Sequence, residues 1–270
     1  MLVVFRRLSM LSIEKQIVYL ISCAEVIEAQ ELVRLYEADG RSGQYIRNVL
    51  ARLKKMGYIE SAERSRYRIT EVGKSFVRSF NRKPQLPAAE WDHKWQIVMF
   101  EFPDGLRRQR QMLVNHLRDL GFGRLYDSVY ISPWDHSDNL AQYAAEKRLA
   151  SCLSVASGCA VPGLDTPGRA GEIWPIGDIH RIYEEKEAWF RQEFLPKADN
   201  MPADDRGAFL LFLEIGNVIS EIGLIDPVLP ACLLPASWKG NDLLSEMFAA
   251  MRRVGEAIQD DSVYRKYVNV

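Results

Sequence analysis

The spacing of apolar and polar residues predicts four helices and a short hairpin in the first third of the chain. Apolar residues recur at three- and four-residue intervals in the helical segments, and a polar turn separates the two strand candidates. The expected helices cover 13–23, 29–37, 42–56 and 71–80, and the expected strands cover 58–63 and 66–70. This order of elements is that of a winged helix-turn-helix.

The middle of the chain alternates between strand and helix patterns. Its first strand is followed by a helix that Pro103 and Asp104 open, with Leu113, Leu117 and Leu120 among the apolar positions on one face. The expected strands cover 95–102, 125–132, 153–161 and 171–176, and a second helix covers 138–149. We therefore expect a ferredoxin-like βαβ sandwich.

The last third has a helical pattern, which makes the fold class α+β with several domains. Its helical segments lie at 179–195, 205–224 and 240–258, with proline-rich connections between them. Pro84 and Pro87 mark a linker at 81–92, because proline neither continues a helix nor donates to a sheet ladder. The expected domains are a winged helix-turn-helix at 1–86, a ferredoxin-like domain at 91–177 and a mostly helical C-terminal domain at 178–270.

Composition indicates an ordinary cytoplasmic protein without a metal or cofactor. The longest apolar run, 207–225, contains Glu214 and Glu221, which favour a buried helix over a membrane span. The apolar run at residues 1–5 is too short for the core of an export signal. The 4 Cys and 4 His are scattered without the spacing of a metal site, and no dinucleotide or phosphate-binding loop occurs.

Positive charge is concentrated in the first domain. Residues 41–83 hold 12 Lys or Arg against 3 Asp or Glu, whereas the whole chain has a formal net charge of −1. A basic segment on a helix-turn-helix unit is typical of a protein that binds double-stranded DNA. The alternative is a charged face that only contacts water, which is the common role of such runs.

The helix expected at 42–56 has an apolar side and a polar side. Ile46, Val49, Leu50 and Leu53 share the core side. The opposite side carries amides that can address base edges and cations that can hold phosphates. We expect this helix and the hairpin turn to contact DNA through Ser42, Gln44, Tyr45, Arg47, Asn48, Arg52, Lys55, Arg64, Arg66 and Arg68.

Several motifs after the linker resemble those of the PaaX family of bacterial transcriptional repressors. "WDHKWQIVMFEFP" is similar to the family's entry into its middle domain, and "LRDLGFGRLYDSVYISPWD" is similar to the helix end and strand that follow. The most specific match is "DPVLPACLLPASWKG" at 226–240, whose DP, LP, LLP and W spacing resembles the family's C-terminal signature. The resemblance covers nearly the whole chain.

The resemblance implies a repressor of a catabolic operon that a small acidic effector releases. The best-known ligand of the family is phenylacetyl-coenzyme A, so phenylacetate catabolism and acyl-coenzyme A effectors are the expected context. We also expect a homodimer that places two winged helices on two half-sites of an operator.

Effector binding would use cations at the start of the middle domain's first helix together with aromatic side chains. Free backbone amides and cations both favour phosphate at such a position. The candidate effector residues are Arg107, Arg108, Arg110, Trp134 and Trp174. An exposed charged turn and core aromatic residues are the simpler interpretations of the same positions.

A metal-dependent nuclease is the alternative from a different class. The CRISPR-associated ferredoxin-like subunit that the family's middle domain resembles carries an acidic residue at the end of its first strand, where Glu101 and Asp104 lie in this chain. Two carboxylates without further acids or histidines are a weak signal for an active site. Asp104 also suits the start of a helix. We therefore expect that the protein is not an enzyme.

Overall fold

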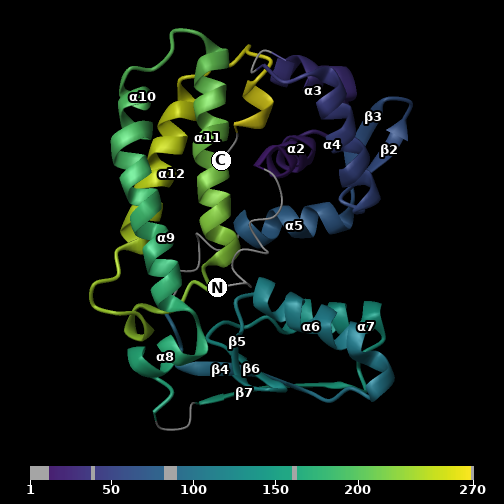
Figure 1. The fold of residues 1–270 in the computed structure, drawn as a ribbon, viewed down its shortest axis with the longest axis vertical. Helices are drawn as coiled ribbons and strands as arrows, with labels where there is room; N and C mark the ends of the chain where they lie inside the picture. The colour runs from purple at the N-terminus through teal and green to yellow at the C-terminus, as the bar shows by residue number, and fades with distance from the viewer. Residues whose placement is uncertain (1–11, 38–39, 82–89, 160–162, 269–270) are drawn as a thin grey trace. The chain divides into compact units, whose positions relative to one another are not determined.

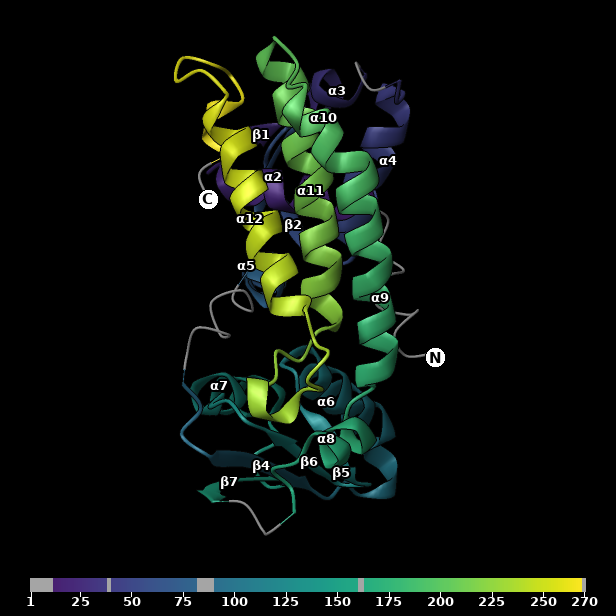
Figure 2. The same ribbon diagram turned by 90° about the vertical axis from the view of Figure 1, so that its left-hand side faces the viewer.

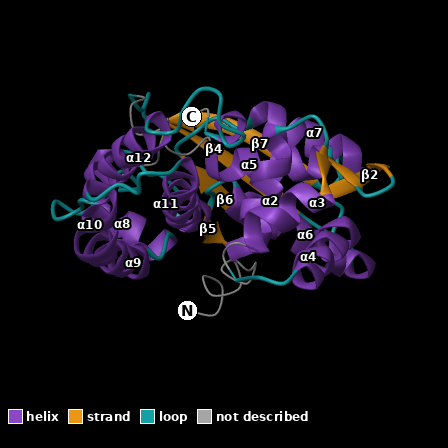
Figure 3. Ribbon diagram, turned by 90° about the horizontal axis from the view of Figure 1, so that it is seen from above, coloured by secondary structure: helices purple, strands orange, loops and turns teal. Residues whose placement is uncertain are grey.

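The computed structural model of the protein describes residues 12–37, 40–81, 90–159 and 163–268. It confirms the α+β class, because helices predominate (Figure 3) and the strands form two separate antiparallel sheets. The chain divides into two units: unit 1 contains residues up to 82, 185–223 and those from 242 onward, and unit 2 contains 83–184 and 224–241. Most of the expected linker lies outside the described residues, and the division into three domains stays a prediction.

The winged helix-turn-helix is confirmed as part of unit 1 (Figure 1, purple to blue). Its described elements are α2 Ser12–Cys23, β1 Ile27–Glu28, α3 Ala29–Glu37, α4 Gly43–Lys55, β2 Ile59–Glu63, β3 Arg66–Ile69 and α5 Glu71–Asn81. The three strands form an antiparallel sheet in the order β1-β3-β2. The hairpin of β2 and β3 is the wing.

The sequence pattern does not reveal β1, because a strand of two residues shows no alternation of apolar and polar positions. Ile27 of β1 pairs with Tyr67 of β3. Next to this pair, the backbone N–H of Ala29 donates to the carbonyl of Ser65 at 2.8 Å. The wing is thereby tied to the connection between α2 and α3.

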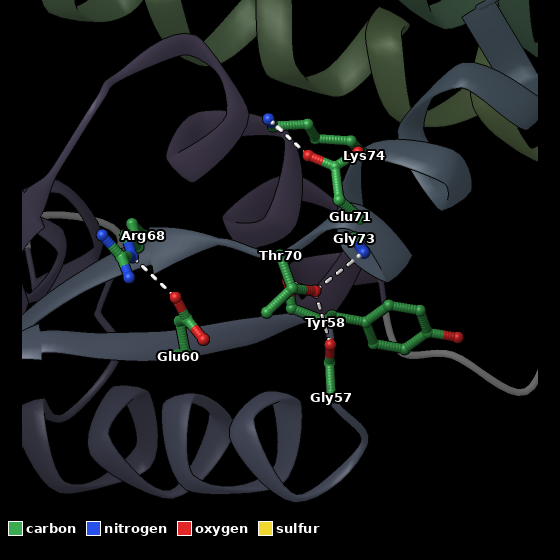
Figure 4. A network of polar contacts seen from close by, with 8 residues as sticks. All are labelled: Gly57, Tyr58, Glu60, Arg68, Thr70, Glu71, Gly73 and Lys74. Carbon is green, nitrogen blue, oxygen red and sulfur yellow. Dashed lines mark hydrogen bonds and ion pairs between the residues drawn. The ribbon is translucent and has the colours of Figure 1, made fainter.

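Thr70 and Gly73 form the junction between the wing and α5 (Figure 4). The Thr70 hydroxyl lies 2.5 Å from the Gly57 carbonyl oxygen and 3.0 Å from that of Tyr58, and it accepts from the backbone N–H of Gly73 at 3.1 Å. A Cβ atom added to Gly73 would lie 2.2 Å from the Tyr58 carbonyl oxygen. Only glycine fits at this point of the chain.

The helical segments expected after residue 178 are confirmed. They are α9 Ile176–Trp189, the π-helical turn η3 Phe190–Phe194, α10 Leu195–Asp199, α11 Asp205–Ile225 and α12 Gly240–Glu256. Residues of α9 from 185 onward belong to unit 1. Figures 1 and 2 both show α10, α11 and α12 side by side. The π turn ends two residues before Pro196, whose ring does not fit against the preceding turn of a regular α-helix.

α11 is the apolar helix that the sequence predicts to be buried. It is long and apolar enough to cross a membrane, but 67% of its most apolar window is buried inside the protein, as in a core helix. Phe209, Phe212 and Ile215 on this helix are each no more than 1% exposed. The prediction of a buried helix is therefore confirmed.

Unit 2 contains a four-stranded antiparallel sheet in the order β5-β6-β4-β7. Its elements are β4 Lys94–Phe100, α6 Arg107–Asp119, β5 Gly123–Tyr126, β6 Val129–Ser132, α7 Ser137–Lys147, β7 Leu153–Cys159 and α8 Pro167–Ile173. Strand, helix, two strands, helix and strand follow one another, which is the ferredoxin-like arrangement. The predicted sandwich is thus confirmed in its topology.

Two predictions of elements in this unit are wrong in detail. The single strand expected at 125–132 is the hairpin of β5 and β6, because the chain turns back at 127–128. The strand expected at 171–176 is instead the end of helix α8, two non-helical residues and the start of α9. Thr166 caps α8 by accepting from the backbone N–H of Arg169, and Pro167 occupies its first turn, so capping outweighs the short apolar run.

Both faces of the unit 2 sheet contribute to apolar clusters, because alternate residues of β4 point to different cores, while the edge strand β7 is mostly exposed. Trp95 belongs to a buried cluster with Trp174 of α8 and Leu233. Val98, on the opposite face, belongs to a cluster with Leu117 of α6. β4 therefore lies between two sets of apolar residues.

A half-buried histidine of α6 packs against α7. The ring of His116 stacks on Tyr143 with centroids 4.0 Å apart, and its Nε2 lies 2.7 Å from Oδ1 of Asn139. Burial lowers the pKa of His116, and the hydrogen bond with Asn139 only partly opposes this effect. The folded protein therefore favours the neutral ring.

We predict that Gly73→Ala lowers the free energy of unfolding by about 1–3 kcal/mol, because the clash with Tyr58 outweighs the helix preference of alanine. The matched control is Gly216→Ala within α11, where the new Cβ meets only Met251, at 3.7 Å. The control should be neutral or should raise stability by up to about 1 kcal/mol. Urea unfolding measures both, and equal stability of the two variants would show the clash argument to be wrong.

We also predict that stability falls as pH decreases through about 6.5. The pKa of His116 is lowered in the folded state, so the unfolded chain takes up this proton first and acid favours unfolding. His116→Phe keeps a ring against Tyr143 and removes the titrating group. Its free energy of unfolding should change less between about pH 7.5 and about pH 5.5 than that of the wild type. An unchanged slope would contradict the assignment to His116.

Candidate nucleic-acid interface

α4 has the two sides that its sequence predicts. Ile46, Val49, Leu50 and Leu53 are buried. The helix starts at a cap, because the Ser42 hydroxyl accepts from the backbone N–H of Tyr45 at 3.2 Å. Ser42, a predicted DNA contact, thus fixes the beginning of α4.

The outer side of α4 carries exposed amides and cations. Gln44, Arg47, Asn48 and Lys55 are all exposed. The Gln44 Nε2 donates to Asn48 Oδ1 at 3.0 Å, one helical turn apart. This bond orients the two amides, which leaves an acceptor on Gln44 and donor hydrogens on Asn48 for a further partner. Tyr45 is half-buried, with the Arg41 guanidinium 5.7 Å from its ring centroid.

Arg52 of α4 forms an ion pair with a buried carboxylate of another helix. Its Nη2 lies 2.8 Å from Oε1 of Glu14 on α2. The Glu14 side chain is only 8% exposed, while that of Arg52 is 50% exposed. Sequence reasoning missed Glu14, and the available signal was an acidic residue beside the apolar positions Ile13 and Ile17.

The wing carries arginines and their counter-charges on the same hairpin. Arg68 pairs with Glu60 on the neighbouring strand at 2.6 Å (Figure 4), and Arg66 pairs with Glu63 at 3.0 Å. Arg64 is exposed in the turn. The wing therefore presents less net charge to a partner than its three arginines suggest.

Ion pairing divides the predicted DNA-binding cations into two groups. Arg52, Arg66 and Arg68 have carboxylate partners within unit 1. In the described part of the chain, no ion pair holds Arg47 or Lys55 on α4, or Arg64 on the wing. These three cations are available to neutralise phosphates, and the amide pair lies on the same helix as two of them.

The residues expected to bind an effector have separate contacts within unit 2. Arg107 and Arg108 are exposed in the first turn of α6. Arg110 donates to the carbonyl of Asp127 at 3.0 Å and lies over the ring of Phe100.

The two candidate effector tryptophans are hydrogen-bonded to backbone carbonyls. Trp134 Nε1 donates to Val228 at 2.6 Å, and the buried Trp174 Nε1 donates to Gly121 at 3.0 Å. Trp174 also stacks on Trp95 in the core cluster, with ring centroids 6.1 Å apart. These contacts give both side chains a structural role, and their part in effector binding stays a prediction.

The two carboxylates of the nuclease alternative follow β4. Glu101 and Asp104 are exposed, and Asp104 begins the short helix η2 Asp104–Leu106. Among the described residues, no group of three or more His, Cys, Asp or Glu is arranged to hold a metal ion.

These features define a winged-helix protein with a basic recognition helix and a ferredoxin-like domain. The family model described as "PaaX protein central Cas2-like domain" matches residues 88–167, and that described as "PaaX-like protein C-terminal domain" matches residues 174–261. Together the two matches cover more than half of the chain. The chain therefore belongs to the PaaX family.

Two relatives span most of the chain. The transcriptional repressor PaaX of Escherichia coli (strain K12) is 27% identical over 240 residues, which cover 84% of this chain and 73% of the relative. Among solved structures, the uncharacterized protein Rv0674 from Mycobacterium tuberculosis matches with a TM-score of 0.51 at 19% identity. That match covers 85% of this chain and 91% of the other, and it shows a similar fold only.

We predict that Arg52→Ala lowers the free energy of unfolding by about 1–3 kcal/mol, because it leaves the buried carboxylate of Glu14 without its charged partner. Arg47→Ala removes an exposed and unpaired charge from the same helix, so it should change stability by less than about 0.5 kcal/mol. Urea unfolding of the two variants measures the difference. Equal stability would mean that the Glu14 ion pair contributes nothing to the fold.

Proposed function

We propose that the protein is a DNA-binding transcriptional repressor that acts in the cytoplasm. The observation that carries the proposal is the outer side of α4, where Arg47 and Lys55 are exposed and have no ion-pair partner among the described residues, beside the amides of Gln44 and Asn48. Membership of the PaaX family and the similarity to the Escherichia coli repressor support the same function.

In this proposal the cations position the protein on DNA and the amides read the sequence. Arg47, Lys55 and Arg64 neutralise phosphates, which gives affinity without sequence information. The hydrogen bond from Gln44 to Asn48 leaves one acceptor and one donor side by side. An adenine edge in the major groove requires this pair of groups, so we expect an A·T pair opposite α4.

A homodimer with two half-sites and release by an acyl-coenzyme A complete the proposal. Two copies of α4 would read a palindromic operator, because the symmetry of such an operator mirrors that of a dimer. The exposed Arg107 and Arg108 of α6 suit the phosphates of a coenzyme A ester. Such an effector lowers operator affinity only if it binds the DNA-free state more tightly. The regulated genes would belong to a catabolic operon, such as one for phenylacetate.

The proposal predicts steeply salt-dependent and selective DNA binding. Selection from a random duplex library by the immobilised protein supplies a candidate operator, and fluorescence anisotropy compares it with a scrambled duplex of the same length. We expect tighter binding of the selected duplex, and a slope of log affinity against log salt of about −0.9 for each phosphate contact. Equal, weakly salt-dependent binding of both duplexes would contradict the function.

Arg47→Ala tests the interface directly. It should weaken binding of the selected duplex by about 1–3 kcal/mol if Arg47 contacts a base, or reduce the salt slope by about 1 if it contacts a phosphate. Arg252→Ala is the matched control, because Arg252 is exposed on α12 of the same unit and the change removes the same charge. Wild-type binding by Arg47→Ala would exclude this face of α4.

The same duplexes test the nuclease alternative. Incubation with Mg²⁺ or Mn²⁺ should leave them intact on a denaturing gel. Metal-dependent cleavage that Glu101→Ala abolishes would favour the nuclease, since Glu101 lies at the position where the ferredoxin-like relatives carry their acidic residue.

A further inference from the structure

α2 carries two adjacent residues of opposite charge that are both buried. Glu14 is 6% exposed and Lys15 is 3% exposed. Of the described residues, only these two and Asp226 combine an ionisable acidic or basic side chain with burial. Buried charges are costly unless they are paired, so the partners of Glu14 and Lys15 decide how α2 is held.

The two charges pair in different directions. Glu14 binds Arg52 of the recognition helix at 2.8 Å. Lys15 Nζ lies 3.7 Å from Oε1 of Glu221 on α11. A single turn of α2 therefore has one charged contact with α4 and another with α11.

Glu221 is the centre of the second contact. Its carboxylate accepts from Lys186 Nζ of α9 at 2.7 Å and from the Asn217 amide at 3.0 Å, in addition to facing Lys15. Burial alone would raise the pKa of Glu221, but Lys186 and Lys15 lower it, so the carboxylate stays ionised. Burial lowers the pKa of Lys15, and Glu221 opposes that loss of charge.

Further hydrogen bonds join α2 and α3 to the end of the described chain, at Lys266 and Tyr267. The Glu31 carboxylate of α3 accepts from Lys266 Nζ at 2.6 Å and from the Tyr267 hydroxyl at 2.5 Å. The Tyr19 hydroxyl of α2 donates to the Tyr267 carbonyl at 3.0 Å. The winged helix is thus one folded body with α11 and the end of the chain.

We propose that Glu221 is a positioning residue for DNA binding, which sets the orientation of α4 through the Lys15 and Glu14 pairs of α2. The proposal rests on the proposed function, because it assumes that α4 is the helix that contacts DNA. Glu221 itself touches no DNA in this scheme. Its effect on the operator passes through a chain of ion pairs from α11 to α2 and from α2 to α4.

The mechanism follows from the cost of an unpaired buried charge. Without the Glu221 carboxylate, the ammonium group of Lys15 either stays buried alone or moves towards water. Movement of Lys15 shifts the first turn of α2, and Glu14 lies in that turn. Arg52 then loses its ion pair with Glu14 in the original position, and α4 is no longer held in one orientation. Fewer of the α4 contacts can therefore form on DNA at the same time.

Glu221→Gln tests the proposal, because glutamine keeps the size and the hydrogen-bonding oxygen but removes the charge. It should weaken binding of the selected duplex by about fivefold or more. Glu214→Gln is the matched control on the same helix, since Glu214 pairs with Lys197 at the surface. The control should bind like the wild type.

The double variant Lys15→Met with Glu221→Gln should recover most of the lost affinity, since an apolar side chain in place of Lys15 removes the unpaired charge. All titrations are made well below the melting temperature of each variant. A purely structural role would lower the melting temperature of Glu221→Gln and leave its affinity within twofold of the wild type, which would overturn the proposal. Failure of the double variant to recover would also overturn it, because the effect would not pass through Lys15.

Hydrogen exchange separates this proposal from the proposed function. Amides of α4 should exchange faster in Glu221→Gln than in the wild type or in Glu214→Gln, and this measurement needs no DNA. If the wild type selects no duplex but the α4 amides exchange faster in Glu221→Gln, the proposed DNA binding is wrong and the positioning of α4 by Glu221 stands. If α4 exchange is unchanged, the positioning proposal is wrong whatever the wild type binds.

Discussion

Burial of the Lys15 ammonium group is the constraint on which unit 1 depends. An ammonium group out of water costs several kcal/mol unless a counter-charge and hydrogen bonds compensate it. Lys15 is 3% exposed, and Glu221 of α11 supplies the counter-charge. α2 also contacts α4, α5 and β3, and its Ile17 and Ile21 are fully buried. A helix that the chain adds much later therefore supplies the counter-charge for the central helix of the winged helix.

Other ion pairs of unit 1 reduce the positive charge that the winged helix can offer to a partner. Counting Lys and Arg in the sequence treats every charge as equally available. Arg52, Arg66 and Arg68 are held by carboxylates of the same unit, so their charge is partly neutralised before any partner arrives. Arg47 and Lys55 are exposed on the outer side of α4 and have no carboxylate partner in the described part of the chain, so their charge stays available to a partner.

Periodicity predicted those parts of the fold that local sequence determines. The buried side of α4 follows from the spacing of residues such as Ile46 and Leu53, and burial confirms it. The strand expected at 171–176 failed because a short apolar run fits either element, and the cap at Thr166 decides for helix. The Glu14 and Glu221 pairs could not be predicted, because they join residues from distant helices and no spacing rule connects them. The DNA-contacting role of the exposed side of α4 stays a prediction.

Unit 1 is assembled from three stretches of chain, with the stretches of unit 2 between them. At roughly 5–20 residues per second, the ribosome needs on the order of 7–29 s to add the residues between the end of α5 and the end of α11. During this interval the nascent winged helix has no α11 to cover α2, and Lys15 remains in water. The order of synthesis therefore postpones the pairing of Lys15 until α11 has been made.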